Sequence, residues 1–487
     1  MAAAQPSPDA AGLARSLRPV QRPAGLTAGG GQIVQVPSAA ALIRAAKLGG
    51  HVAFAVADAK SGLMLESNEA DLAQPPASVT KSVTALYALD ALGPDYRFVT
   101  RLIATGPVQG GVLNGDLVLA GGGDPTLDTD DLGEMAQQLK AAGVQRVAGQ
   151  FLVWGGALPY FRQIDPSQPD HVGYNPAISG LGLNYNRVHF EWKRGGDGWI
   201  TTMDARGRKY RPEVQMARVE IKDRSLPVYT YKEVNGQDRW TVASKALGKG
   251  GARWLPVRQP AIYAGEVFRS LARAQGISMK APRKSKAVPH GDVLVRHRSR
   301  DLRSVLRLML KYSNNYTAEL VGLTATLKRG GNATSLRSSA AVMNRWAAAH
   351  FGMSRASLVD HSGLEPTSRL TAQGMATALV KAHKAGVLQP ILKHVAMRHK
   401  NGKENRGHPI KVFAKTGTLN FVSNLAGYIV AKDGTELAFA IFSANEGKRA
   451  HIPKADRESP HGARGWNIQA KRLQQRLIER WGALYGG

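Results

Sequence analysis

The sequence contains no cysteine among its 487 residues. Disulfide bonds, cysteine-ligated metals and thiol nucleophiles are therefore excluded, while the redox compartment stays open. No stretch reaches the roughly 18 apolar residues that a membrane-spanning helix needs, so we expect no transmembrane segment. An apolar fraction of 43% with 7% aromatic residues is ordinary for a globular protein and argues against disorder.

Acidic residues are scarce relative to basic ones. The chain has 36 Asp and Glu against 65 Lys and Arg, which gives a formal net charge of +29. This balance favours an anionic partner, such as nucleic acid, a membrane surface or an acidic cell-wall polymer. The cations form separate clusters, for example at 206–209 and 283–286, without a zinc-finger spacing or an aromatic RNA-binding signature. We therefore expect an anionic envelope surface and no specific nucleic acid.

The histidines do not show a metal-binding pattern. His383, His394, His399 and His408 are close in sequence, but no spacing of the His-Glu-x-x-His kind is present. The interpretation that we favour is a solvated basic surface, and we expect neither a metal nor a cofactor.

Helical and strand-like patterns are mixed along the chain, which indicates an α+β protein. A length of 487 residues exceeds what one hydrophobic core usually serves, so two or three lobes are expected. Short strands and glycine-rich turns dominate the middle of the chain. We predict helices at residues 38–48, 78–92, 128–142, 264–275, 302–310, 317–327, 335–350, 371–385 and 463–485, and strands at 51–57, 63–67, 112–119, 411–414, 423–430 and 436–443.

One stretch carries a candidate nucleophile with a candidate base. Ser78 and Lys81 are three residues apart at the start of a predicted helix, so their side chains share one face. A serine hydroxyl is a poor nucleophile until a base takes its proton, and an amine can do so when its pKa is lowered by burial or by a second cation. The spacing alone is weak evidence, because it also occurs in ordinary solvated helices.

Two further motifs follow in the order that serine-acylating enzymes use. Ser313 and Asn315 form a Ser-x-Asn between two predicted helices, and Lys415-Thr416-Gly417 ends a predicted strand. Each has an ordinary explanation, as a helix cap or a turn. All three in this order are the set found in class A β-lactamases and penicillin-binding proteins.

Each group has a chemical role in acyl transfer. Ser78 attacks a carbonyl, Lys81 accepts its proton, and Ser313 relays that proton to the leaving amine. Asn315 orients Lys81 and the substrate amide. Lys415 supplies a cationic field that keeps Lys81 neutral and attracts a substrate carboxylate.

The strand motif and two backbone groups complete the predicted site. Thr416, Gly417 and Thr418 are assigned to substrate binding, with the two hydroxyls placed for hydrogen bonds to the carboxylate. The backbone N–H groups of Ser78 and Thr418 are expected to form the oxyanion hole.

With these motifs the chain resembles the class C low-molecular-mass penicillin-binding proteins, which are D-alanyl-D-alanine carboxypeptidase/endopeptidases. The large gap between Ser78 and Ser313 is a mark of that family. The resemblance implies a penicillin-recognising serine-transferase/β-lactamase-like fold, with an antiparallel sheet flanked by helices and split by a large β-rich insertion. The segments that carry the resemblance are 76–81, 92–98, 115–117, 121–125, 313–315, 318–319 and 415–418.

The resemblance predicts four parts of the chain. Residues 1–32 are a flexible N-terminal lead, and 33–102 are the first part of the acyl-enzyme (transpeptidase-like) domain. Residues 103–289 form inserted domains II and III, and 290–487 complete the acyl-enzyme domain. The lead lacks the apolar core of a secretory signal. We expect a periplasmic protein from which a signal has been removed.

The loop after the second motif departs from the family pattern Asp-Gly-Ser-Gly-Leu-Ser-Arg. Residues 360–369 read Asp-His-Ser-Gly-Leu-Glu-Pro-Thr-Ser-Arg, with a histidine in place of the first glycine and three additional residues before Ser368. Glu365-Pro366 is similar to the deacylating Glu-Pro of class A β-lactamases, but the accompanying asparagine is missing.

The predicted function is a serine DD-peptidase of peptidoglycan that is inhibited by β-lactams. Its partners would be peptidoglycan stem peptides, with β-lactams as covalent inhibitors. Two alternatives stay open: a catalytically idle cell-wall-binding or scaffolding protein, and a β-lactamase or esterase on the same fold. Carboxypeptidase and endopeptidase activities are not distinguished by the sequence.

Overall fold

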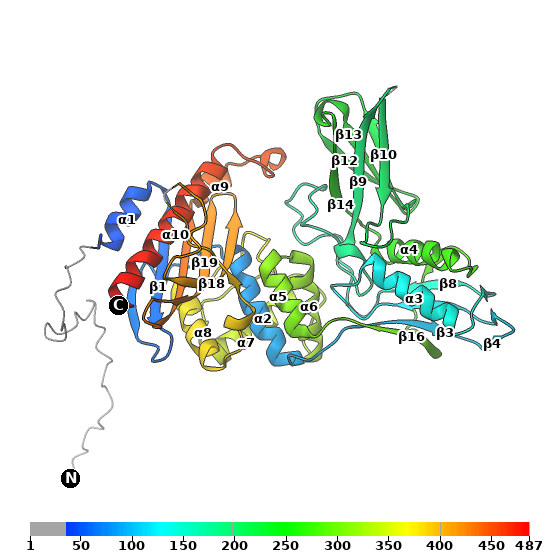
Figure 1. The fold of residues 1–487 in the computed structure, drawn as a ribbon, viewed down its shortest axis with the longest axis horizontal. Helices are drawn as coiled ribbons and strands as arrows, with labels where there is room; N and C mark the ends of the chain where they lie inside the picture. The colour runs from blue at the N-terminus through cyan, green and yellow to red at the C-terminus, as the bar shows by residue number, and fades with distance from the viewer. Residues whose placement is uncertain (1–35, 197, 400, 487) are drawn as a thin grey trace, which may run out of the picture.

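The computed structural model describes residues 36–196, 198–399 and 401–486. The predicted lead at 1–32 lies outside these ranges. Figure 1 shows a part built from both ends of the chain, with a central sheet between helices, and a second part built from the middle of the chain, from which a β-rich lobe projects.

The first part is organised around a six-stranded sheet in the order β17-β18-β19-β20-β1-β2, with every neighbouring pair antiparallel. Side chains alternate between its two faces. In β20, for example, Ala440 and Phe442 enter one core while Phe439 and Ile441 enter the other. The strands are β1 (His51–Asp58), β2 (Met64–Asn68), β17 (Lys393–His394), β18 (Lys411–Leu419), β19 (Val422–Val430) and β20 (Glu436–Ala444).

Helices cover both faces of this sheet (Figure 1). The first face packs against α2 (Thr80–Leu92), α5 (Leu302–Tyr312), α6 (Asn315–Lys328), α7 (Leu336–Phe351) and α8 (Ala372–Lys384). The second face packs against α1 (Ala39–Ala46) and α10 (Ala463–Tyr485). The predicted α+β class, with an antiparallel sheet flanked by helices, is confirmed.

The middle of the chain is β-rich, as predicted. Its main sheet runs β15-β8-β6-β3-β16 beside α3 (Thr129–Ala141) and α4 (Pro260–Ala274), and two three-stranded sheets form the projecting lobe. The strands are β3 (Val99–Ala104), β4 (Val108–Gln109), β5 (Val112–Leu113), β6 (Leu117–Ala120), β7 (Arg146–Val147), β8 (Phe151–Trp154), β9 (Arg187–Gly195), β10 (Gly198–Asp204), β11 (Ala217–Lys222), β12 (Tyr229–Val234), β13 (Gln237–Ala243), β14 (Gly250–Pro256), β15 (Pro282–Lys284) and β16 (Asp292–Arg298).

The two connections between the parts lie side by side, because β3 pairs with β16 in an antiparallel arrangement. The domain limits near residues 102 and 289 stay a prediction. The short strands predicted within 112–119 are β5 and β6, separated by a turn. The strand predicted at 411–414 extends to Leu419, because β19 pairs with it along its whole length.

Candidate active site

Ser78 lies in a 3-10 turn (η1, Ala77–Val79) that leads into α2. The turn is held against the sheet from two strands. Asn424 of β19 donates its side-chain N–H to the carbonyl of Pro75 at 2.8 Å. Gly417 of β18 approaches so closely that a Cβ there would lie 2.6 Å from the carbonyl oxygen of Pro76. The glycine of the Lys-Thr-Gly motif thus lets the strand pack directly against the nucleophile turn.

Lys81 lies one helical turn after Ser78 and is fully buried. Its Nζ is 2.9 Å from Ser78 Oγ, 2.7 Å from Asn315 Oδ1 and 2.6 Å from the carbonyl oxygen of Ser362. Burial lowers the pKa of Lys81 to about 8, against the opposing influence of the Asp360 and Glu319 carboxyl groups. The amine therefore exchanges its proton close to neutral pH.

This geometry suits a neutral amine that acts as a base. A neutral lysine has two N–H hydrogens and one lone pair. The Asn315 and Ser362 oxygens are pure acceptors and take the two hydrogens. The lone pair is left for the hydroxyl hydrogen of Ser78, which is the contact that a general base requires.

The second motif comes from the junction of α5 and α6. Ser313 is the C-cap of α5 with a φ of 57°, and Asn314 is the N-cap of α6, accepting the N–H of Thr317 at 2.9 Å. The helix-cap explanation of this sequence is therefore correct for Asn314. It leaves Ser313 and Asn315 on either side of the cap, directed at the two lysines.

The third motif comes from β18. Lys415 is 1% exposed, and its Nζ donates to Ser313 Oγ at 2.9 Å and to the carbonyl of Thr416 at 2.7 Å. Thr416 and Thr418 are exposed, and Thr418 lines the cleft. The three predicted motifs, which are far apart in sequence, meet in one place.

Two effects keep the buried lysines from holding a proton each. Burial is the largest cause of the low pKa of Lys81. Burial, Lys81 and Lys393 lower the pKa of Lys415 well below its usual value, and the repulsion between Lys81 and Lys415 acts on both amines. A substrate carboxylate beside Lys415 would favour its charged form.

The site opens into a cleft of about 700 Å³ whose lining includes Ser78, Ser313, Asn315 and Thr418. The inserted region supplies one wall, and Asn315 Nδ2 donates to the carbonyl of Tyr174 in it at 3.0 Å.

Another wall of the cleft is formed by the segment 446–458, which includes α9 (Glu446–Ala450). This segment reaches the inserted region, because Arg457 donates to the carbonyl of Ser167 at 2.8 Å and His171 contacts Glu458 at 2.8 Å.

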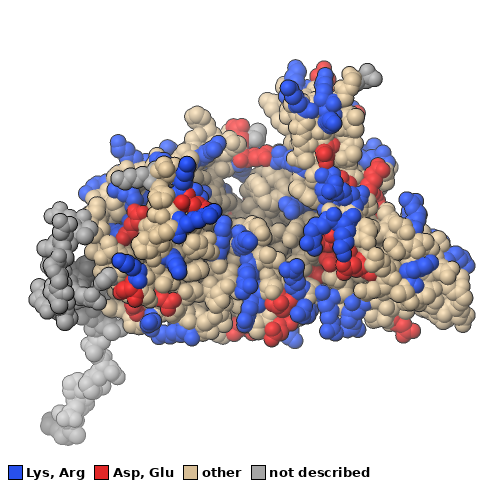
Figure 2. Space-filling view, viewed as in Figure 1, with Lys and Arg blue, Asp and Glu red and all other residues tan. Residues whose placement is uncertain are grey.

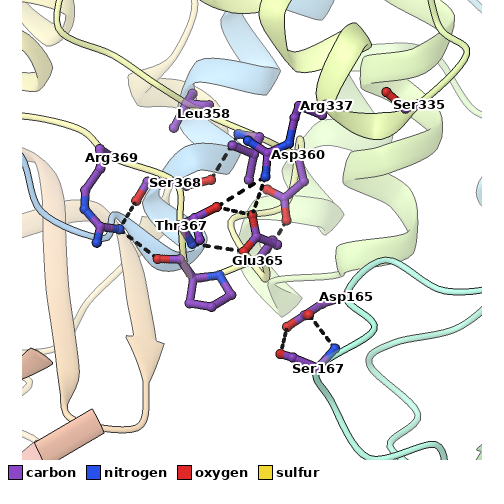
Figure 3. Close-up of polar contacts among 12 residues, drawn as sticks. Asp165, Ser167, Ser335, Arg337, Leu358, Asp360, Glu365, Thr367, Ser368 and Arg369 are labelled. Carbon is purple, nitrogen blue, oxygen red and sulfur yellow. Dashed lines mark hydrogen bonds and ion pairs between the residues drawn. The ribbon is translucent and has the colours of Figure 1, made fainter. Parts of the chain in front are cut away.

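Figure 3 shows the loop 360–369 beside Asp165 and Ser167 of the inserted region. The Glu365 carboxylate accepts the N–H of Thr367 at 3.1 Å and contacts Arg337 at 3.4 Å. Glu365 lines the same cleft as Ser78, and its carboxylate contacts its own loop and α7.

The sequence did not indicate the backbone carbonyls of Ser362 and Tyr174 or the segment 446–458 as parts of the site. A contact made by a backbone carbonyl cannot be recognised from residue type. Buried Glu319 can be recognised, since a lone acid in the apolar run of α6 indicates a special environment.

Residues 36–196, 198–399 and 401–486 contain neither a membrane-spanning helix nor a metal-binding cluster. No helix there is both long and apolar enough to cross a membrane. Within the same ranges no group of three or more His, Cys, Asp or Glu side chains is arranged to hold a metal ion. Of the four histidines considered above, His383 contacts Gln389 and Glu436, and His408 accepts the N–H of Ile410.

Comparison with known proteins agrees with this geometry. The model of the D-Ala-D-Ala carboxypeptidase 3 (S13) family matches residues 37–459. The D-alanyl-D-alanine carboxypeptidase of Actinomadura sp. (strain R39) is 28% identical over 82% of this chain and 78% of its own. The D-alanyl-D-alanine carboxypeptidase DacB of Haemophilus influenzae is 24% identical over 75% of this chain and 79% of its own.

The crystal structure of penicillin binding protein 4 (dacB) from Haemophilus influenzae superimposes with a TM-score of 0.73 at 19% identity, covering 91% of this chain and 100% of that one. The fold and the site thus define a serine peptidase with the penicillin-recognising fold. The chain belongs to the D-Ala-D-Ala carboxypeptidase 3 (S13) family.

Proposed function

We propose that the enzyme hydrolyses peptidoglycan stem peptides at D-Ala-D-Ala or D-amino-acid cross-links through an acyl-enzyme on Ser78. The observation that carries this proposal is the position of Lys81 Nζ, 2.9 Å from Ser78 Oγ, with its other two polar contacts made by carbonyl oxygens. Membership of a carboxypeptidase family supports the choice of substrate.

In the acylation step, Ser78 Oγ attacks the carbonyl carbon of the penultimate D-Ala while Lys81 takes the hydroxyl proton. The backbone N–H groups of Ser78 and Thr418 stabilise the oxyanion. The proton then passes through Ser313 to the leaving amine, and the C–N bond breaks to release D-Ala. In the second step water attacks the ester carbonyl carbon, one proton of that water passes to Ser78 Oγ, and the C–O bond to Ser78 breaks to release the shortened peptide.

Lys415, Thr416 and Thr418 provide recognition of the substrate carboxylate. Lys415 supplies a cation and the exposed threonines supply hydroxyl donors. A β-lactam presents a carboxylate and a strained amide in similar positions, so it would acylate Ser78 and leave slowly. As part of this proposal, residues 33–102 and 290–487 form the acyl-enzyme domain and 103–289 wall its cleft.

The direct test measures D-Ala released from a peptide that ends in D-Ala-D-Ala, with a penicillin and an ester as competing substrates. Wild type is expected to release D-Ala, and Ser78→Ala is expected to lose at least about 10⁴-fold in rate, as nucleophile removal does in serine peptidases. Faster turnover of the penicillin or of the ester than of the peptide would instead indicate the alternative hydrolase activities.

We also propose a periplasmic location and an anionic envelope surface as a partner. Figure 2 shows Lys and Arg side chains over the visible face of both parts of the molecule. A basic surface lies on the two packed helices α1 and α10, because their exposed residues include Arg44, Lys47, Lys471, Arg472 and Arg476.

This surface predicts salt-sensitive binding to isolated cell walls in a sedimentation assay. Raising the salt from about 0.1 M to about 1 M shortens the Debye length from about 10 Å to about 3 Å, so most of the bound protein is expected to dissociate. Changing Lys471, Arg472 and Arg476 to Gln should weaken binding at low salt. The matched change of Lys232, Lys245 and Lys249 in the inserted region controls for net charge, and equal effects of the two triple variants would contradict a role for α10.

A further inference from the structure

Two buried carboxyl groups lie beside Lys81, and the mechanism above assigns neither of them. Glu319 on α6 is 0% exposed and Asp360 in the loop after α7 is 1% exposed. Buried acids are rare and are retained only when they are paired or hydrogen-bonded. Three titratable groups interact with Lys81, namely Glu319, Asp360 and Lys415. His361 is also buried nearby, but it is neutral because burial lowers its pKa to about 3.

Residues 361–362 connect these acids to the catalytic amine. The carbonyl oxygen of Ser362 accepts an N–H of Lys81 at 2.6 Å, and its hydroxyl donates to Asp360 Oδ2 at 3.3 Å. The N–H of His361, the preceding residue, donates to Glu319 Oε2 at 3.1 Å. A single short segment thus contacts both acids and the base.

The hydrogen bonds assign different protonation states to the two acids. Asp360 accepts the N–H groups of Gly363 at 2.6 Å and Glu365 at 2.9 Å in addition to the Ser362 hydroxyl, a donor set that suits a carboxylate. Glu319 Oε1 has no hydrogen-bond partner among the described residues. Burial and the Asp360 charge raise the pKa of Glu319 to about 8.

We propose that Glu319 is a positioning residue that shares one proton with Lys81 and so sets the pH above which the lysine can act as the base. When the proton lies on Glu319, the carboxyl and the amine are both neutral and Lys81 has a free lone pair. When it lies on Lys81, a buried carboxylate faces an ammonium and the lone pair is absent. Burial raises the pKa of Asp360 as well, but its three hydrogen-bond donors favour the carboxylate there over a carboxylate at Glu319. This inference rests on the proposed acylation of Ser78.

The proton balance determines in which direction the pH dependence of acylation moves when Glu319 is replaced. Lys81 must be neutral to accept the Ser78 proton, so the acylation rate rises as the pH increases through the value at which the amine deprotonates. Glutamine at position 319 is neutral and cannot take the proton or form the buried ion pair. Lys81 then has one anionic neighbour fewer, and its neutral form is reached at lower pH.

The test follows the rate of Ser78 acylation by a fluorescent penicillin between about pH 5 and about pH 10, a range that brackets free Glu and Lys. For Glu319→Gln we expect the acidic limb to move to lower pH by about one unit. Ser362→Ala keeps the carbonyl but removes the hydroxyl donor to Asp360, which makes the Asp360 carboxylate less favourable, so the limb should move in the same direction by less. Glu266→Gln, at a half-buried acid of the inserted region that accepts two backbone N–H groups, is the matched control and should leave the limb in place.

A purely structural role for Glu319 predicts a lower rate at every pH with an unmoved limb, and that result would overturn the inference. An absence of acylation in wild type would instead overturn the proposed function. The two failures are therefore distinguishable in one experiment.

Discussion

Replacement of Lys81 by methionine is expected to slow the acylation of Ser78 by about 10⁴-fold, the upper range for the loss of a general base. Methionine has a similar length and fits an apolar site, but it has no lone pair on nitrogen to accept the Ser78 proton. It also loses the contacts to Asn315 and to the Ser362 carbonyl, which lie at 2.7 and 2.6 Å. The rate of fluorescent penicillin labelling measures this loss.

Lys311→Met is the matched control for this variant. Lys311 is exposed at the end of α5, close to the second motif in sequence, so its removal changes the charge of the chain equally without touching the base. The control is expected to acylate at the wild-type rate. If Lys81→Met stayed within tenfold of wild type, another group would have to be the base, and the assignment of Lys81 would be wrong.

The second large effect is expected for Gly363→Ala, in the loop that holds the Lys81 amine. Gly363 has a φ of +73°, and a Cβ there would lie 1.9 Å from the carbonyl oxygen of Ala77, the residue before the nucleophile. The contact is with backbone, so the loop or the Ser78 turn must move. Positive φ and overpacking each cost about 1–3 kcal/mol, so we expect a loss of about 2–6 kcal/mol in the free energy of unfolding.

The rate of Ser78 acylation should also fall in the Gly363→Ala variant. A displacement of about 1 Å in a reacting group can cost about 100-fold in rate, and Ser362, the neighbour of Gly363, provides the carbonyl that orients Lys81. Urea unfolding measures the stability, and penicillin labelling of the folded fraction measures the rate.

Gly386→Ala separates backbone strain from the steric contact. Gly386 has a φ of +65° and no atom within 4 Å of its would-be Cβ. Only the strain, about 1 kcal/mol, is expected there, with no change in the acylation rate. Equal effects of the two alanine variants would contradict the packing argument for Gly363.

The sequence could predict which residues meet at the candidate site, because the proposed chemistry requires particular residue types at short spacings. Ser78 and Lys81 are linked by one helical turn, and the lysine of the strand motif precedes small residues that allow close packing. The apolar runs at 51–57 and 436–443 were likewise predicted as strands, and they form β1 and β20.

The remaining features depend on contacts between distant residues. β18 continues through Thr418 because β19 pairs with it, although Thr-Gly-Thr by itself has the composition of a turn. The Ser362 carbonyl and the Tyr174 carbonyl act through backbone atoms, which any residue type would provide. The leading cause of the lowered pKa of Lys81 is its burial, which depends on the packing of the surrounding elements.

The central claim is that Ser78 is the acylated nucleophile, and intact-mass spectrometry after incubation with a penicillin tests it most directly. Wild type is predicted to gain the mass of one penicillin per chain, and Ser78→Ala is predicted to gain none. The same adduct on Ser78→Ala would place the nucleophile elsewhere. No adduct on wild type, with no hydrolysis of the penicillin in the same tube, would contradict the catalytic account and favour a wall-binding protein.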